Sequence, residues 1–511
     1  MRRAIAIAAA IAITVSLGGC SALIPKVASN ESVPTGETVS ADLEPYYAQV
    51  LEWNSCANGM QCATAKAPLD WSDPAADSID LALTRTVATG STPIGSILVN
   101  PGGPGGSGVD FVQNSENGGV TDAVHERFDI VGFDPRGVGA STSVSCASDP
   151  AVLDKYFFGD PSDDSDLEVG SDAWLQEGVD QTTEFGQECL ANTGPLLEHV
   201  DTESAARDMD MLRAALGDKK LTYLGFSYGT YLGATYADLY PANVGRVVLD
   251  GAVDPAVTST ESSAIQAVGF ENALKAYLTD CIGQTSCPFT ATVDADMLTI
   301  RDLLDALDES PLRNTDGREL DSSAMTTAIV YPLYDEANWP YLDQLFSSVM
   351  AGDPSLAWQL VDGYYDRDTD GTYLSNTFEA FIAINCLDDS SVASFDEVRA
   401  QAAEIEKVAP VFGPQFGYGG AGCSGWPFTG TRTPGPITAE GSGDILVVGT
   451  TNDPATPYEQ AVSLADELEN GHLVTYNGEG HTAYGRSNSC ILDTVDAYFL
   501  EGTVPETDPQ C

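Results

Sequence analysis

The sequence predicts an α/β fold, in which a mostly parallel sheet is covered by helices and interrupted by an inserted helical cap domain. Three observations support this fold class. Short apolar runs alternate with helical stretches over residues 45–255, strand-like runs become rare over residues 256–440, and the alternation returns over residues 441–511. Strands that alternate with helices are typical of a parallel sheet with both faces covered.

The first part of the expected sheet domain spans residues 45–255. Apolar residues at helical spacing predict a helix over 205–216, directly before a strand. A second helix is expected over 230–240, and it ends at Pro241, which cannot continue a helix. Apolar runs predict strands at 79–86, 94–100, 128–133, 221–224 and 246–249.

Residues 256–440 change character and predict a helical cap over the sheet. Turns rich in Gly, Pro and Asp separate its expected helices, which lie at 262–278, 295–307, 341–350 and 395–408. The sheet domain resumes over 441–511. There we expect strands at 445–448 and 472–476 and a closing helix at 491–500.

Residues 1–19 have the features of a lipoprotein signal peptide. Two arginines follow Met1, and residues 4–17 form an apolar run too short to span a bilayer comfortably. Residues 17–20 read Leu-Gly-Gly-Cys, which resembles a bacterial lipobox, so Cys20 is the expected lipidation site. An ordinary signal peptide cleaved nearby is the alternative. Residues 20–44 are rich in Ser, Thr, Pro and Glu and are expected to form a flexible tether.

We therefore expect an exported protein, held on the outer face of the cell membrane by a lipid on Cys20 or secreted. The number of cysteines agrees with export, because eleven are present and removal of Cys20 leaves an even number. No metal site is expected, since no two cysteines are spaced Cys-x-x-Cys and none lies beside a histidine. Pairing cannot be deduced from sequence, and we expect local bridges: Cys56–Cys62, Cys146–Cys189, Cys281–Cys287, Cys386–Cys423 and Cys490–Cys511.

The chain is strongly acidic. It carries 22 Lys and Arg residues against 76 Asp and Glu residues, a formal net charge of −54. Nucleic acid is therefore not expected as a partner. Such a charge can attract cationic substrates, although a solvated surface suited to an exported protein explains it more simply.

Ser227 is the expected nucleophile. Residues 225–229 read Gly-Phe-Ser-Tyr-Gly and lie between a predicted strand and a predicted helix. This context is typical of a nucleophile elbow, a tight turn that projects the serine hydroxyl from the edge of the sheet. A plain Gly/Ser turn is the alternative, because the pattern by itself is weak in a chain with 49 glycines.

A serine hydroxyl needs a base to remove its proton and a third group to orient that base. Two histidines follow Ser227 in the sequence. His472 opens a predicted strand and is expected to be structural, whereas His481 follows that strand and is the expected base. The expected orienting acid is Asp453, in the loop after the 445–448 strand. Asp250, after the 246–249 strand, remains a rival.

A glycine-rich loop follows the 94–100 strand, since residues 100–108 read Asn-Pro-Gly-Gly-Pro-Gly-Gly-Ser-Gly. Acyl transfer needs N–H donors aimed at the developing oxyanion, and glycines let the backbone approach closely. We expect the N–H groups of Gly103 and Tyr228 to be these donors. A phosphate loop is not expected, because no Gly-Lys-Ser/Thr follows, and a plain flexible loop is the alternative.

These motifs occur in one order together with Asp-Pro-Arg-Gly-Val-Gly at 134–139, Ala-Ala-Arg-Asp-Met-Asp at 205–210 and Val-Leu-Asp-Gly at 248–251. As a set they resemble the exported α/β-hydrolases of the tripeptidyl-aminopeptidase group from actinobacteria, which are related to proline iminopeptidases. The resemblance covers about residues 45–505. It implies an α/β-hydrolase fold, a catalytic triad of Ser227, Asp453 and His481, peptide substrates cleaved from a free N-terminus, and no metal or cofactor.

The sequence departs from the proline iminopeptidases at one position. Those enzymes usually begin the oxyanion loop with His-Gly-Gly-Pro-Gly, whereas Pro101 stands at the place of the histidine here. This difference favours the tripeptidyl group over an enzyme that releases single residues. Residues 383–389 read Ala-Ile-Asn-Cys-Leu-Asp-Asp and also resemble a segment of that group. Asp388 is therefore the expected contact for the substrate ammonium, with a merely solvated carboxylate as the alternative.

The leading expectation is an exported, lipid-anchored serine aminopeptidase that releases short peptides, tripeptides above all. A carboxylesterase or lipase-type serine hydrolase is the alternative, because fold and triad are shared and fold does not determine substrate. A non-catalytic surface-binding lipoprotein is the second alternative, and the intact set of Ser227, Asp453 and His481 argues against it. The oligomeric state is not predicted.

Overall fold

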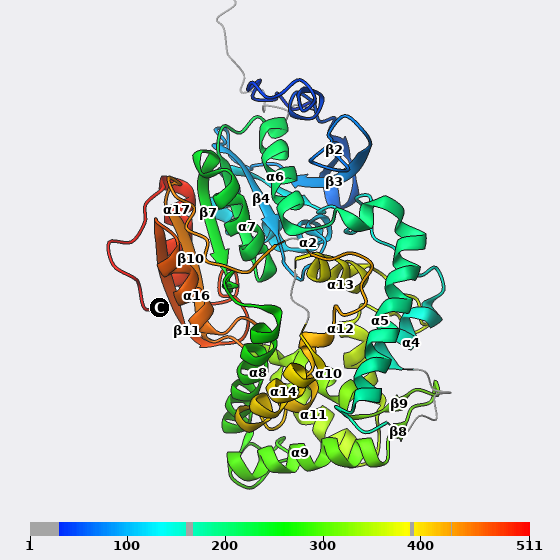
Figure 1. Cartoon of the computed structure of the whole chain (residues 1–511). Helices are drawn as coiled ribbons and strands as arrows, with labels where there is room; N and C mark the ends of the chain where they lie inside the picture. Colours follow the sequence, from blue (N-terminus) through cyan, green and yellow to red (C-terminus); the bar gives the residue numbers. More distant parts are fainter. Residues whose placement is uncertain (1–29, 160–166, 389–392, 431) are drawn as a thin grey trace, which may run out of the picture.

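The computed structural model describes residues 30–159, 167–388, 393–430 and 432–511. The predicted signal peptide and Cys20 lie outside these residues. Figure 1 shows a sheet domain above and a helical cap below, with α13 (Thr377–Asp388) between them. The predicted architecture of an α/β domain with a helical cap is therefore confirmed.

Within the described residues, nine strands form one sheet in the order β1-β2-β3-β5-β4-β6-β7-β10-β11. The pairs from β1 to β5 are antiparallel, and those from β5 through β4 to β11 are parallel. The strands are β1 (Asn54–Ser55), β2 (Gln61–Pro68), β3 (Ser78–Thr86), β4 (Gly95–Asn100), β5 (Phe128–Phe133), β6 (Leu221–Phe226), β7 (Val244–Asp250), β10 (Ile445–Asn452) and β11 (Gly471–Glu479).

Successive residues of the central strands point into two separate cores. In β7, Val247 belongs to the core that contains α6 (Thr202–Leu216), α7 (Tyr228–Leu239) and α16 (Tyr458–Glu467). Val248 belongs to the core that contains α2 (Gly108–Asn114), α3 (Asp122–His125) and α17 (Ser489–Glu501). Both faces are covered, which explains the continuous apolar character of these strands. The helices of this domain are α1 (Glu44–Tyr47), α2 (Gly108–Asn114), α3 (Asp122–His125), α6 (Thr202–Leu216), α7 (Tyr228–Leu239), α16 (Tyr458–Glu467) and α17 (Ser489–Glu501).

The cap has a hydrophobic core of its own, with Phe270, Ile329 and Phe346 among its buried residues. A short antiparallel ribbon of β8 (Leu312–Arg313) and β9 (Glu319–Leu320) lies at its edge. Its further helices are α8 (Ser259–Cys281), α9 (Val293–Glu309), α10 (Ser322–Leu333), α11 (Trp339–Met350), α12 (Ser355–Tyr364), α14 (Phe395–Val408) and α15 (Gly413–Phe416). Short 3₁₀ helices are η1 (Ala57–Gly59), η2 (Glu116–Gly118), η3 (Gly194–Glu198), η4 (Pro241–Asn243), η5 (Glu336–Asn338) and η6 (Gly419–Ala421).

The cap also includes a segment that the sequence analysis placed in the sheet domain. The helices α4 (Pro150–Phe158) and α5 (Asp172–Thr193) run along the side of the cap in Figure 1. Arg367 pairs with Asp154 of α4 at 2.9 Å, and Phe157 stacks on Tyr365 with ring centroids 4.8 Å apart. The cap is therefore built from two segments of the chain rather than from the single predicted insertion.

The predicted tether ends earlier than expected. The N–H of Thr35 donates to the carbonyl of Ala214 at 2.9 Å, and Glu37 pairs with Arg213 at 2.8 Å. The prediction of a flexible tether is therefore wrong for residues 30–44, because long-range contacts with α6 hold this segment on the sheet domain.

The five predicted disulfides are all present: Cys56–Cys62, Cys146–Cys189, Cys281–Cys287, Cys386–Cys423 and Cys490–Cys511. Two of them connect segments near the junction of cap and sheet. One joins α5 to residue 146 after β5, and the other joins α13 to residue 423. Such cross-links stabilise a fold mainly by restricting the unfolded chain.

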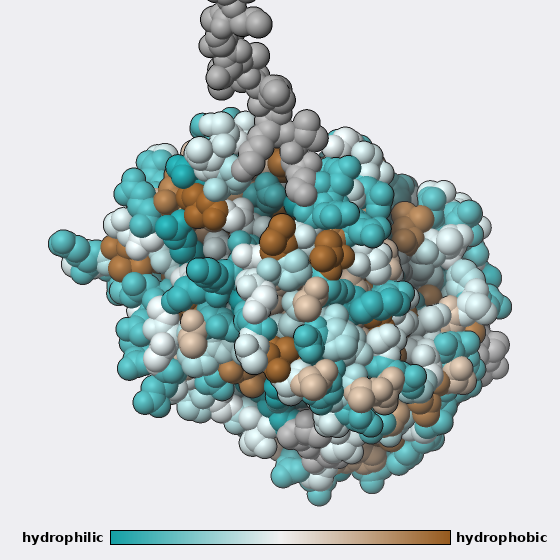
Figure 2. Space-filling model, turned by 90° about the horizontal axis from the view of Figure 1, so that it is seen from above, coloured by the Kyte–Doolittle hydropathy of each residue, from teal (hydrophilic) through white to brown (hydrophobic). Residues whose placement is uncertain are grey.

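The face of the molecule seen in Figure 2 is mainly hydrophilic. Figure 2 shows the hydrophobic residues of one face in small separate groups, which is usual for a protein surface and does not indicate a large docking area there. Among the described residues, none of the helices combines the length and the apolar character needed to cross a bilayer.

Candidate active site

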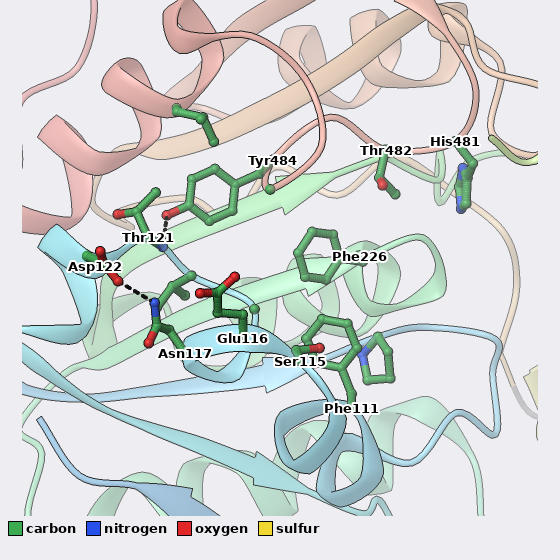
Figure 3. A pocket seen from close by; sticks show the side chains of 15 residues that line it. Phe111, Ser115, Glu116, Asn117, Thr121, Asp122, Phe226, His481, Thr482 and Tyr484 are labelled. Carbon is green, nitrogen blue, oxygen red and sulfur yellow. Dashed lines mark hydrogen bonds between the residues drawn. The ribbon is translucent and has the colours of Figure 1, made fainter. Parts of the chain in front are cut away.

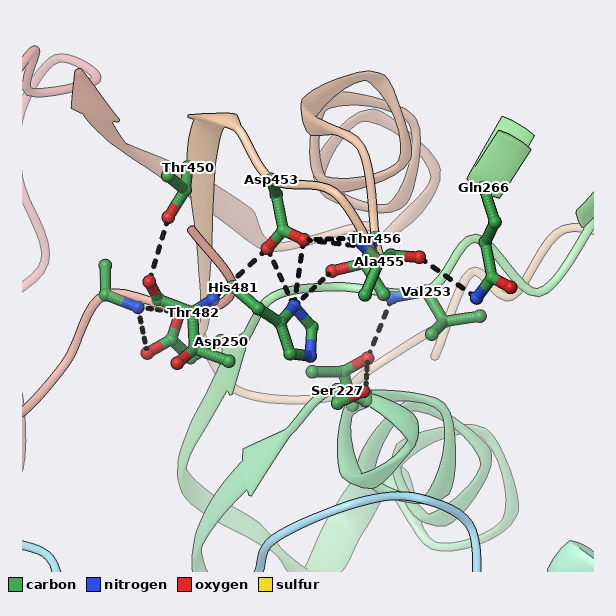
Figure 4. A network of polar contacts seen from close by, with 12 residues as sticks. Ser227, Asp250, Val253, Gln266, Thr450, Asp453, Ala455, Thr456, His481 and Thr482 are labelled. Carbon is green, nitrogen blue, oxygen red and sulfur yellow. Dashed lines mark hydrogen bonds and ion pairs between the residues drawn. The ribbon is translucent and has the colours of Figure 1, made fainter. Parts of the chain in front are cut away.

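The predicted catalytic residues meet at one edge of the sheet. Ser227 follows β6, Asp250 ends β7, Asp453 follows β10 and His481 follows β11. Because these neighbouring strands are parallel, their carboxyl ends lie at the same edge, where ligands of such sheets bind. Figure 4 shows His481 between Asp453 and Ser227.

Ser227 lies in a strained turn between β6 and α7, with φ 55° and ψ −127°. This conformation is unfavourable for a residue with a side chain and is typical of functional sites. The turn is fixed by its neighbours, because the N–H of Ser227 donates to the Asp250 carbonyl at 2.9 Å. A Cβ on Gly225 would lie 2.4 Å from the carbonyl oxygen of Gly229, so the close approach of strand and helix requires glycine.

Asp453 holds the imidazole of His481. Nδ1 of His481 lies 2.9 Å from each carboxylate oxygen of Asp453. The carboxylate is buried and also accepts the N–H groups of Ala455, Thr456 and Thr482 at 2.9, 2.8 and 3.2 Å. Its position is therefore set by several hydrogen bonds before any substrate is present.

The contact with Asp453 determines the chemistry of the other ring nitrogen. A carboxylate beside Nδ1 favours the tautomer in which Nδ1 carries the proton and Nε2 is a free base. Among the described residues, Nε2 of His481 is buried and has no hydrogen-bond partner. In Figure 4 the ring extends toward Ser227, as a base for that hydroxyl must.

Asp250, the rival acid, serves another purpose. Its carboxylate accepts the N–H of Ala483 at 3.0 Å and that of Tyr484 at 2.7 Å, both in the loop that carries His481. The side chain is fully buried, and burial raises its pKa to about 6 although these N–H groups and the nearby His481 oppose the shift. Asp453 and not Asp250 is therefore hydrogen-bonded to the imidazole of His481.

The glycine-rich loop lies directly against the elbow. A Cβ on Gly102 would be 2.8 Å from Cβ of Ser227 and 3.1 Å from the backbone N of Tyr228. The Asn100 side chain shapes the loop by accepting the N–H of Gly102 at 2.9 Å. Tyr228 begins α7, so its N–H is one of those that a helix leaves without an internal acceptor. The loop and the helix end thus border the same space beside Ser227, while the donor role of Gly103 stays a prediction.

Asp388 lies at the end of α13, close to the elbow. Its oxygens accept the N–H of Thr202 at 2.8 Å and the Thr202 hydroxyl at 2.5 Å, and that hydroxyl also contacts the hydroxyl of Tyr228. Burial raises the pKa of Asp388 to about 7, against the opposing effect of the Thr202 hydrogen bonds. Among the described residues, Thr202 alone donates hydrogen bonds to this carboxylate, and the contact of Asp388 with a substrate ammonium stays a prediction.

Three residues that the sequence analysis did not assign to the site support His481. Thr456 places Oγ1 3.4 Å from Nδ1 of His481, and the carbonyl of Tyr334 accepts the His481 N–H at 2.8 Å. Arg486 donates Nε to the carbonyl of His481 at 2.9 Å. Thr456 lies three residues after Asp453, so its place near the site follows from the local sequence. Tyr334 belongs to the cap, and no sequence pattern links it to His481.

Among the described residues, one group brings possible metal-ligand atoms close together: Cys281, Cys287 and Asp343 in the cap. The two cysteines are joined in a disulfide, so neither can offer the thiolate that a metal would bind. This group therefore does not fit a metal ion.

A parallel sheet with a serine at an elbow, followed along the chain by an acid and a histidine after later strands, defines the α/β-hydrolases. Comparison with known proteins agrees, since residues 409–511 match the family model of the TAP-like protein. The chain is 36% identical over 494 residues to the serine protease Hip1 of Mycobacterium tuberculosis, with 92% of each chain covered. It is 37% identical over 511 residues to carboxylesterase B of the same organism, with 97% of this chain and 96% of that protein covered.

A third relative is the tripeptidyl aminopeptidase of Streptomyces lividans, 33% identical over 481 residues, with 90% of this chain and 86% of that protein covered. Among solved structures, proline iminopeptidase from Mycobacterium smegmatis aligns over 85% of this chain and 97% of its own, at 13% identity and a TM-score of 0.32. The nearly full-length relatives show that the chain belongs to the TAP-like family of α/β-hydrolases. It is a serine hydrolase.

Loss of the carboxylate should affect mainly activity at Asp453 and mainly stability at Asp250. Asp453→Asn removes the charge that orients His481, so we expect kcat to fall by about 10⁴-fold while the thermal midpoint changes by only about 3 °C. Asp250→Asn leaves the partner of His481 in place but weakens the anchor of its loop, so we expect a clear loss in thermal midpoint and a fall in kcat of less than about tenfold. Turnover and thermal unfolding of both variants check this, and the reverse pattern would make Asp250 the functional acid.

Asp388 should make stability depend on pH. Between its ordinary pKa of 3.8 and about 7, the folded protein holds a proton that the unfolded chain has released, so the stability due to this group falls as the pH rises through that window. Asp388→Asn removes the titration. The thermal midpoint of the variant minus that of wild type should therefore increase from about pH 4.5 to about pH 8. An equal difference at both pH values would contradict the raised pKa of Asp388.

Proposed function

We propose that this serine hydrolase is an exported peptidase that releases short peptides, tripeptides above all, from free N-termini. Relatives named as a serine protease and a tripeptidyl aminopeptidase, both similar over most of the chain, support this proposal. The main structural support for this proposal is the position of the cap, which contacts both the oxyanion loop and His481.

The cap touches the site at two places. A Cβ on Gly105 would lie 2.2 Å from the carbonyl oxygen of Thr377, so the start of α13 lies directly on the oxyanion loop. At the other place Tyr334, which follows α10, accepts the N–H of His481 and packs its ring edge-on against the imidazole at 5.5 Å between centroids. A site covered in this way favours the end of a chain over an extended internal segment.

The proposed reaction has two steps. Nε2 of His481 takes the proton of Ser227 as Oγ attacks the scissile carbonyl carbon, and the N–H groups of Gly103 and Tyr228 hold the oxyanion. Protonated His481, stabilised by Asp453, then gives its proton to the leaving nitrogen as the C–N bond breaks. Water, activated by His481, hydrolyses the acyl-enzyme and restores the Ser227 hydroxyl.

The proposed release of peptides from a free N-terminus requires recognition of an ammonium group. Asp388 is our candidate, because Thr202 connects its carboxylate to the hydroxyl of Tyr228, the residue next to the nucleophile. Export and a lipid anchor on Cys20 also belong to this proposal. They are supported by the signal-peptide pattern and by five disulfides, which persist in oxidising compartments.

A carboxylesterase is the second candidate. It is favoured by the relative named carboxylesterase B, which is as similar to this chain as the named protease. The same triad hydrolyses esters and amides, so the substrate class depends on the cap and not on the catalytic residues.

The test uses purified protein without residues 1–19 and a matched set of chromogenic substrates. One-, two- and three-residue anilides, each with a free and an acetylated N-terminus, are compared with a short-chain ester. We expect turnover of free-amine anilides, fastest for three residues, and its loss by several orders of magnitude in Ser227→Ala. Ester turnover without anilide cleavage would establish the esterase instead.

The Asp388 assignment has its own readout. If Asp388 binds the ammonium, Asp388→Asn should lower kcat/KM for the free-amine anilide by about tenfold or more and leave the slow turnover of the acetylated anilide nearly unchanged. Asp508→Asn serves as the exposed control. If the ratio of kcat/KM between the free-amine and the acetylated anilide were unchanged, Asp388 would not bind the ammonium. Its role would then be to hold α13 against Thr202.

A further inference from the structure

A cavity of about 660 Å³ opens beside the catalytic histidine, on a side to which the cap contributes no lining residue. His481 and Thr482 form one end, and Thr121 and Asp122 form the other (Figure 3). Its walls come from α2, from η2 and from the loop between β11 and α17, all parts of the sheet domain.

The cavity borders three parts of the catalytic apparatus. Phe226 directly precedes the nucleophile, Pro101 directly precedes the glycines of the oxyanion loop, and His481 is the base. In acyl transfer the base hands its proton to the leaving nitrogen, so the leaving group must lie against His481. A space that begins at His481 and leads away from the cap is therefore placed to receive the leaving part of the substrate.

The lining combines an apolar wall with an acidic rim. Phe111 and Phe226 pack together with ring centroids 5.7 Å apart. Glu116 is exposed at the rim, and its carboxylate has no hydrogen-bond or ion-pair partner among the described residues. Figure 3 shows Glu116 between Asn117 and Phe226. A side chain with an aliphatic stem and a cationic end matches this lining, because the stem can cover the aromatic wall while the charge stays near water.

We propose that this cavity is the subsite for the first residue of the leaving peptide and that it prefers lysine or arginine there. The proposal rests on the proposed peptidase function and adds its selectivity on the leaving side. Glu116 attracts the cation, and the same carboxylate repels an acidic residue. The substrate class is a peptide with a free N-terminus and a basic residue directly after the scissile bond.

The charge of the whole chain, −54, attracts any cationic peptide and must be separated from this local effect. Exposed charges act over about 8 to 10 Å at physiological salt, so an acid elsewhere on the surface should contribute little to selectivity at this position. Glu177, an exposed residue of α5, provides the matched control as Glu177→Gln.

The experiment uses peptides that share the three residues giving the fastest anilide turnover, followed by lysine, norleucine or glutamate and then by glycine amide. Norleucine keeps an aliphatic stem like that of lysine without the charge. For wild type we expect kcat/KM to be roughly threefold higher with lysine than with norleucine and roughly tenfold higher with lysine than with glutamate. In Glu116→Gln the ratio of lysine to norleucine should fall to within about twofold of one, and Glu116→Lys should reverse the order of lysine and glutamate.

The anilide separates this proposal from the proposed function, because its uncharged leaving group carries no side chain for Glu116 to attract or repel. Glu177→Gln should cleave the anilide at the wild-type rate and keep every wild-type peptide ratio. Anilide cleavage by wild type together with unchanged peptide ratios in Glu116→Gln would overturn the subsite alone. Absence of anilide and peptide cleavage by wild type would overturn the peptidase function and the subsite with it.

Discussion

Asp250 connects the two parts of the catalytic apparatus. Its backbone carbonyl accepts the N–H of Ser227 at 2.9 Å, and its carboxylate accepts N–H groups of Ala483 and Tyr484 in the loop that carries His481. One residue at the end of a central strand is thus hydrogen-bonded both to the turn of Ser227 and to the loop of His481. Because it is fully buried, ionising its carboxylate is costly, and the two N–H donors offset part of that cost.

The position of the cap depends on a second set of polar contacts, centred on α13. Asn376, just before this helix, donates to the carbonyls of Gly137 and Val144 and accepts the N–H of Gly139. Glu379 accepts the N–H of Cys146, the residue that is also bound to Cys189 of α5. These contacts attach the cap to the loop after β5, next to the oxyanion loop, so the same helix serves cap docking and the site.

Much of the site could be predicted because its signals are local. The turn at Ser227, the glycine-rich loop and the strand before His481 each occupy fewer than about ten residues, and the order of such motifs along the chain is typical of the fold. The choice between Asp453 and Asp250 could not be made in this way, since both acids follow buried strands. Only the three-dimensional arrangement shows that one is bonded to the imidazole and the other to the backbone of its loop.

The failures of prediction involve contacts between distant segments. Residues 30–44 have the composition of a tether, yet Thr35 and Glu37 bind residues of α6 more than 170 positions away. The helices α4 and α5 follow a strand of the sheet domain in sequence, but their aromatic and charged side chains find partners in the cap. Neither arrangement leaves a periodic pattern in the sequence, because single long-range pairs and not a repeated face determine it.

Through the contact between Thr377 and Gly105, the cap packs directly against the glycine-rich loop of the site. Raising α13 to admit a bulky, folded chain would remove the packing that fixes the glycine-rich loop beside Ser227. The position of the cap and the shape of the loop beside the nucleophile are therefore coupled, so a movement of this helix would change both at once.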